Sequence, residues 1–100
     1  MARLHYEVTA TLPDEETATR FIRWLLDGHL DDVIRGGAIS AEAIRLDGEE
    51  YRVLSRYTFE SRAAFNAYES GPAIALRAEG VELFGNAGVT FDRRVGEILD

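Results

Sequence analysis

A β-hairpin signal in the middle of the chain limits its fold more than any other local feature. Two runs rich in apolar and β-branched residues, 39–46 and 50–59, flank the dipeptide Asp47-Gly48. This dipeptide suits the positive φ angles of a two-residue turn. The sequence therefore predicts two neighbouring antiparallel strands joined by a tight turn.

The register that such a turn imposes distributes the side chains over two faces. We expect Ile44 opposite Tyr51, Glu42 opposite Val53 and Ala41 opposite Leu54. One face then carries Ile44, Leu46, Tyr51, Val53, Tyr57 and Phe59, and the other carries Ala41, Ala43, Arg52, Leu54, Arg56 and Thr58. Apolar groups on both faces exceed what a sheet exposed on one side requires, which predicts a second covering layer.

Alternating apolar and polar residues near both ends of the chain predict two more strands. Residues 4–11 and 89–95 show the period of two that is typical of half-buried strands. Before the hairpin, Asp14 is placed to cap a helix that bends at Gly28 and ends at Gly36-Gly37. One face of this helix is expected to carry Ala18, Phe21, Ile22, Leu25, Leu26, His29 and Val33.

After the hairpin, the sequence predicts two shorter helices. Ser61 is placed to cap the first of them, and Gly71-Pro72 breaks it. Proline is favourable at the first position of a helix, so the second helix is expected to begin at Pro72. It runs toward Phe84 with an interruption at Gly80.

The resulting order β-α-β-β-α-β is typical of ferredoxin-like α+β folds. We expect one domain, residues 1–100, with a four-stranded antiparallel sheet, the first and third strands at its centre and helices on one face. The other face then lacks a covering layer. We therefore expect a second copy of the chain to pack on it, sheet against sheet, in a two-fold homodimer.

The composition narrows the classes of function. Eighteen acidic residues against eleven basic ones give a net charge of −7, so nucleic acids and anionic membrane surfaces are poor partners. The absence of lysine and cysteine excludes a lysine Schiff base and a thiolate nucleophile. No segment approaches the roughly 20 apolar residues of a membrane-spanning helix, and we expect a cytoplasmic protein.

Segments spread over nearly the whole chain carry a resemblance. They are Tyr6-Glu7-Val8, Trp24-Leu25 with His29, residues 56–61, Tyr68, residues 76–80, Phe84 and Arg94. These segments resemble a small bacterial family of unknown function in the dimeric α+β barrel superfamily, whose members pair two ferredoxin-like sheets into a shared barrel. Relatives in that superfamily include cofactor-free monooxygenases of antibiotic biosynthesis, muconolactone isomerases and haem-degrading enzymes. The resemblance implies a homodimer and leaves the reaction open, and we expect no cofactor.

The first candidate site lies between the sheet and the helices, where the superfamily often places its ligand. His29 is expected on the helix face that meets the sheet, where it is a candidate acid, base or ligand contact. The alternative is a structural histidine that is hydrogen-bonded to a strand or loop. Trp24 and Tyr57 are expected beside it as ligand-binding residues, or as packing residues only.

A second candidate site gathers His5, Glu7, Arg52 and Arg56 on the central strands. The two guanidinium groups suit a carboxylated ligand, and His5 is a second candidate base. Ion pairs between strands or between protomers are the alternative. The two histidines match no metal-binding motif, so we expect no metal site.

Three functions stay open from the sequence. The first is a homodimer that binds a small molecule between sheet and helices. The second is a cofactor-independent monooxygenase or isomerase, with His29 or His5 as the base. The third is a structural or regulatory dimer without a ligand. A cavity of about 300 Å³ or more that His29 faces favours the first two, and a fully packed interior favours the third.

Overall fold

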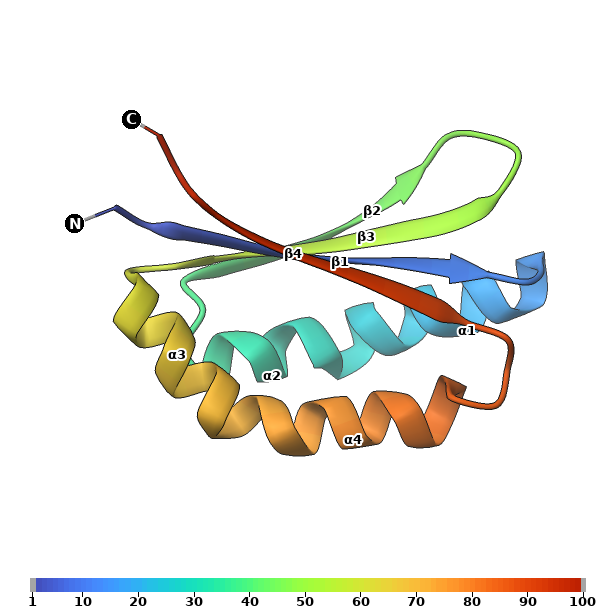
Figure 1. The fold of residues 1–100 in the computed structure, drawn as a ribbon. Helices are drawn as coiled ribbons and strands as arrows, with labels where there is room; N and C mark the ends of the chain where they lie inside the picture. Colours follow the sequence, from blue (N-terminus) through green and yellow to red (C-terminus); the bar gives the residue numbers. More distant parts are fainter. Residues whose placement is uncertain (1, 100) are drawn as a thin grey trace.

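A four-stranded antiparallel sheet forms one layer of the molecule and helices form the other (Figure 1). The computed structural model describes residues 2–99. The strands are β1 (Leu4–Leu12), β2 (Ser40–Leu46), β3 (Tyr51–Phe59) and β4 (Thr90–Glu97), in the order β2-β3-β1-β4. The ferredoxin-like fold is therefore confirmed, with the first and third strands at the centre of the sheet as predicted.

The helices all lie beneath one face of the sheet (Figure 1). They are α1 (Glu15–Trp24), the π-helical turn η1 (Leu25–His29), α2 (Leu30–Arg35), α3 (Arg62–Ser70) and α4 (Pro72–Phe84). Both predicted N-caps are confirmed. The Asp14 carboxylate accepts a hydrogen bond from the Thr17 N–H at 2.7 Å, and the Ser61 hydroxyl accepts one from the Ala64 N–H at 3.1 Å. Among the described residues, no helix is both long enough and apolar enough to span a bilayer.

The first helical stretch bends where the sequence predicts it. Gly28 has non-helical backbone angles, φ 171° and ψ −31°, inside the wide turn η1. This turn carries the chain from α1 into α2 and places His29 at the junction. Leu26 lies at the edge of the predicted buried face and is 62% exposed, so its expected burial is wrong.

The predicted interruption of the last helix at Gly80 is also wrong, because α4 continues through this residue. Gly80 has a packing role instead. A Cβ atom at this position would lie 3.4 Å from the Trp24 ring, so the missing side chain lets the indole pack closely against α4.

The register predicted for the hairpin is wrong by three residues. Ile44 pairs with Leu54 instead of Tyr51, and Ala41 pairs with Tyr57, because five residues, 47–51, separate the last paired residues Leu46 and Arg52, whereas the predicted turn has two. Gly48 does adopt the predicted positive φ, at 139°. An odd shift in register moves every side chain of one strand to the other face.

The corrected register explains which residues the helices cover. Val53, Tyr57 and Phe59 of β3 are buried beneath the helices. On β2, Ala41 pairs with Tyr57 and Ala43 pairs with Ser55, and both small residues pack against the buried core. Ile44 and Leu46 therefore lie on the uncovered side together with Leu54, not beside Val53 as predicted.

We call the uncovered side of the sheet the open face. Alternation along the paired strands assigns to it His5, Glu7, Ile44, Leu46, Arg52, Leu54, Arg56 and Arg94. The open face therefore carries both apolar and charged side chains. Its apolar group consists of Ile44, Leu46 and Leu54 on β2 and β3.

The helix-covered side holds the hydrophobic core in two clusters. The first contains Leu4, Tyr6, Val33, Ala38, Tyr57, Phe59, Phe65, Tyr68 and Ala73. The second contains Ala10, Leu12, Ala18, Phe21, Leu25, Val53 and Phe84. The division of the core leaves room between the two clusters.

Candidate functional site

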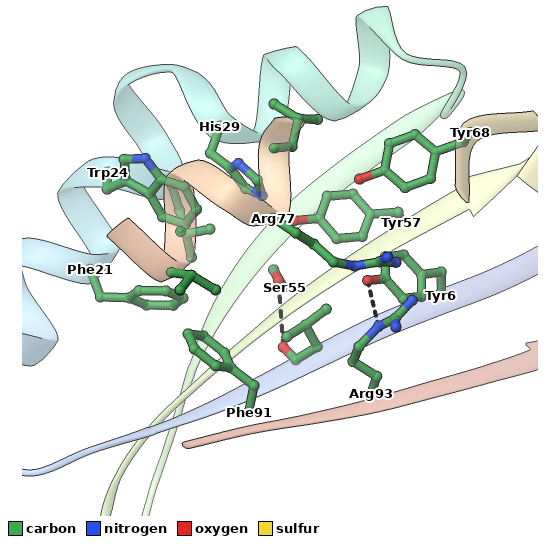
Figure 2. Close-up of a pocket in the computed structure, with 15 residues that line it drawn as sticks. Tyr6, Phe21, Trp24, His29, Ser55, Tyr57, Tyr68, Arg77, Phe91 and Arg93 are labelled. Carbon is green, nitrogen blue, oxygen red and sulfur yellow. Dashed lines mark hydrogen bonds between the residues drawn. The ribbon is translucent and has the colours of Figure 1, made fainter. Parts of the chain in front are cut away.

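A cavity of about 200 Å³ lies between the sheet and the helices, where the two core clusters meet (Figure 2). Its walls are mostly aromatic and aliphatic. The lining residues are Tyr6, Val8, Phe21, Trp24, Leu25, His29, Ser55, Tyr57, Tyr68, Leu76, Arg77, Gly80, Val81, Phe91 and Arg93. The predicted cavity residues Trp24, His29 and Tyr57 are therefore brought together, and ligand binding by them stays a prediction.

His29 presents an unsatisfied polar atom in this part of the molecule. Its ring stacks on the Trp24 indole, with ring centres 4.1 Å apart. Its Nδ1 atom is buried and has no hydrogen-bond partner among the described residues. Burial lowers the pKa of His29, against the opposing effect of the Glu79 and Asp32 carboxylates. The imidazole is therefore neutral at pH 7 and can accept or donate one hydrogen bond.

Trp24 forms a wall of the cavity, and its position is fixed by a hydrogen bond and by ring packing. Its indole N–H donates a hydrogen bond to the Glu79 carboxylate on α4 at 2.7 Å. Its ring packs edge-on against Phe84, with centres 5.5 Å apart, and lies over Gly80. The tryptophan thus links α1 to α4 and holds the His29 ring in place.

Three tyrosines supply hydroxyl groups at the other end. Tyr6 stacks on Tyr57 with ring centres 5.6 Å apart, and Tyr68 packs at 6.4 Å from Tyr6. Burial raises the pKa of Tyr57 to about 12, and burial also raises the pKa of Tyr68. Both phenols are therefore neutral at physiological pH and can donate hydrogen bonds.

Two arginines complete the lining at the tyrosine end. Arg93 Nε donates a hydrogen bond to the Tyr6 hydroxyl at 3.0 Å, and its guanidinium lies 5.3 Å from the centre of the Tyr6 ring. Arg77 and Arg93 both bind the Glu69 carboxylate, at 2.5 Å and 2.6 Å. Burial raises the pKa of Glu69, but hydrogen bonds and charge from the two arginines outweigh it and hold the pKa below its usual value.

Neither Arg77 nor Arg93 was predicted to line the cavity. Arg93 shares one face of β4 with Phe91 and Val95, and this period of two places it on the helix-covered side. That signal was sufficient to find it. The sequence holds no comparable signal for Arg77, because the orientation of α4 decides which residues of that helix reach the cavity.

The second predicted group lies on the open face, away from the cavity. His5 and Glu7 are hydrogen-bonded, with Nε2 to Oε1 at 2.9 Å. Arg56 is opposite Glu7 in the register but forms its ion pair with Glu42, while Arg52 lies opposite Thr11 and pairs with Glu50. The four residues therefore share a face without forming one cluster, and their binding of a ligand stays a prediction.

The grouping of potential metal ligands gives no sign of a metal site in the described part of the chain. Within residues 2–99, no three or more His, Cys, Asp or Glu side chains are gathered so that they could hold a metal ion. His5 and His29 lie on opposite sides of the sheet layer. Of the two candidate bases, only His29 lines the cavity.

Comparison with protein families gives one match over nearly the whole chain. A family model described as "Domain of unknown function (DUF4286)" matches residues 3–98. No curated protein matches the sequence.

Solved structures share the fold at low sequence identity. A dimeric ferredoxin-like protein from an uncultured marine organism has a TM-score of 0.71 and 17% identity, over 100% of this chain and 98% of that chain. A mutant of SnoaB, a cofactor-independent oxygenase from Streptomyces nogalater, has a TM-score of 0.75 and 10% identity, over 100% and 96%. A monooxygenase from Streptomyces coelicolor in complex with nanaomycin D has a TM-score of 0.76 and 14% identity, over 99% and 89%. At these identities the likeness establishes the fold and leaves the function to the site.

Proposed function

The chain belongs to the DUF4286 family, whose function is unknown, and from this premise we propose that it is a homodimer that binds a small ring-containing molecule in the cavity between sheet and helices. The observation that carries the proposal is an aromatic-lined cavity with His29 in its wall, whose buried Nδ1 has no hydrogen-bond partner among the described residues. Buried polar atoms are nearly always hydrogen-bonded. A ligand in the cavity would supply the missing partner.

The size of the cavity limits the ligand. Its 200 Å³ exceeds an engineered apolar cavity of about 150 Å³ that binds benzene. It falls short of the roughly 300 Å³ at which drug-sized sites begin and which we gave above as favouring a ligand-based function. The space suits one ring or two fused rings, and it favours a ligand over a fully packed structural dimer.

The homodimer rests on the open face. Ile44 and Leu54 are cross-strand neighbours there, and Leu46 extends the same apolar group. A second sheet packed against this face would cover the group, and two structural neighbours are described as dimeric ferredoxin-like proteins. We also propose a cytoplasmic location, for which the sequence is the only support.

Cofactor-independent monooxygenation or isomerisation is the second candidate function. Both reactions can begin when a base removes a proton from the substrate. The specific observation in favour is the buried, neutral imidazole of His29 beside the cavity. Structural neighbours that are described as oxygenases support the same candidate.

Binding of 2-naphthol, a neutral two-ring probe, tests the proposed function. The parent chain has one tryptophan, so the NMR signal of the Trp24 indole N–H reports binding at this wall of the cavity without overlap. Calorimetry measures the affinities of the variants below, because each of them adds a second tryptophan. We expect this signal to shift on titration with 2-naphthol. In the variant Leu76→Trp, a larger side chain fills the cavity, and we expect the affinity to fall by about tenfold or more, since a methylene-sized clash alone costs about that factor.

The matched control is Ile74→Trp on the outer face of α4, where the side chain is 63% exposed. This variant should keep the affinity of the parent protein. Equal affinities for the parent protein and Leu76→Trp, with no shift of the Trp24 signal, would place binding outside the cavity and contradict the proposal.

A further inference from the structure

We propose that the ligand of the cavity carries a carboxylate group, which Arg77 and Arg93 bind at the tyrosine end. This inference rests on the proposed function and adds the chemical class of the ligand. Figure 2 shows the two guanidinium groups side by side next to Tyr6, at the end of the cavity away from Phe21 and Trp24. Both groups line the cavity, and both contact the same carboxylate of Glu69.

The charge balance at this end favours an anion. The lining residues include two arginines and no acidic residue. Glu69 contacts both arginines without lining the cavity and neutralises one positive charge, so the pair keeps one positive charge in excess. The excess is notable because acidic residues outnumber basic ones by eighteen to eleven in the chain. A positive charge at the edge of an apolar cavity attracts an anionic ligand more strongly than the same charge in open water.

The geometry of the arginines suits a carboxylate in particular. Each guanidinium is a planar fork with five N–H donors, which matches the two oxygens of a carboxylate. The hydrogen bonds to Glu69 and Tyr6 use only some of these donors. Glu69 also restricts the motion of both side chains, so less conformational entropy is lost when a ligand binds.

The opposite end of the cavity complements this assignment. Phe21, Trp24 and Phe91 provide an aromatic wall for a ring (Figure 2). The His29 imidazole, stacked on Trp24, lines the same end of the cavity as a polar group. The ligand class is therefore an aromatic carboxylate of one or two rings, with its carboxylate between Arg77 and Arg93.

Two probes of matched shape test the inference: 2-naphthoate, which is an anion at pH 7, and 2-naphthamide, which is neutral. Calorimetry gives both dissociation constants for the parent protein and for three variants. We expect the parent protein to bind the naphthoate about tenfold more tightly or better, as one charge-assisted pair allows. Arg93→Gln should remove most of this preference, because it lowers the affinity for the anionic naphthoate much more than the affinity for the neutral naphthamide.

Glu69→Gln should change the naphthoate affinity in the opposite direction to Arg93→Gln. The amide keeps a hydrogen-bond acceptor for the arginines but removes the competing negative charge. We expect the naphthoate affinity to rise by about threefold or more, while the naphthamide affinity stays constant. A purely structural role for Glu69 would instead weaken the binding of both probes. Arg35→Gln, at an exposed arginine paired with Asp32 at the end of α2, is the charge control and should change neither affinity.

The outcomes separate this inference from the proposed function. Equal binding of both probes to the parent protein, or weaker naphthoate binding by Glu69→Gln, overturns the carboxylate assignment and leaves a ligand-binding cavity. Failure of both probes to bind, together with failure of 2-naphthol, overturns the proposed function and this inference with it.

Discussion

The imidazole of His29 couples the stability of the fold to pH. Burial lowers its pKa in the folded state, whereas the unfolded chain keeps the ordinary value near 6.5. Between these two values the unfolded state binds more protons, so the free energy of unfolding decreases as the pH falls below about 6.5. We expect this decrease in urea denaturation measured from pH 7.5 to 5.5, and we expect His29→Gln to remove it.

The second histidine of the chain offers a matched control. His5 lies on the open face beside Glu7, outside the cavity. The variant His5→Gln should keep the pH dependence that His29 causes. If both variants showed the slope of the parent protein, the lowered pKa of His29 would be wrong.

Residues of the site differ in how far the sequence could predict them. The helical period predicted that His29 faces the sheet, and the strand period of β3 predicted that Tyr57 points to the same interior. Arg93 carries the same kind of signal on β4. Arg77 does not, because its place depends on how α4 rotates and packs, and a tertiary contact such as Trp24 over Gly80 sets that rotation.

The cap of α3 shows how one hydroxyl group stabilises a helix. The Ser61 hydroxyl accepts a hydrogen bond from the Ala64 N–H, which has no partner within the helix. Ser61→Ala should lower the free energy of unfolding by about 1 kcal/mol, and the melting temperature by about 5 °C. Calorimetric or circular-dichroism melting curves measure both.

The same substitution at the other end of α3 is the control. Ser70 donates a hydrogen bond to the Asn66 carbonyl at 3.0 Å and caps no N–H group. Ser70→Ala should change the free energy of unfolding by less than about 0.5 kcal/mol. A loss at Ser70 as large as the loss at Ser61 would show that capping is not the cause.

Elements were predicted well from the sequence where the signal is local, and poorly where it depends on distant contacts. Asp14, Ser61 and Pro72 begin helices as expected, because caps and a helix-opening proline act on adjacent backbone. Asp47-Gly48 predicted the hairpin but not its register, because the loop between β2 and β3 is longer than the dipeptide. The burial of Val53 and Tyr57 under the helices fixes the side of the sheet that each residue occupies.

Association of two copies is the property that only the whole molecule can show. In the proposed homodimer, Leu54 lies at the centre of the interface, on central strand β3 and opposite Ile44. The parent protein should sediment at about twice its chain mass of 11.2 kDa. In Leu54→Asp, dimerisation would bury an unpaired charge. We expect the dimer dissociation constant to rise by about 100-fold, as measured by sedimentation equilibrium.

A matched substitution on the helical side separates the two surfaces. Ile74→Asp introduces the same charge on the outer face of α4, where Ile74 is already exposed. The dimer should survive there, because the helices lie beneath the sheet and not on its open face (Figure 1). Dissociation by Ile74→Asp but not by Leu54→Asp would move the interface to the helices. The apolar group Ile44, Leu46 and Leu54 would then lie in water, and the sheet-to-sheet homodimer would be wrong.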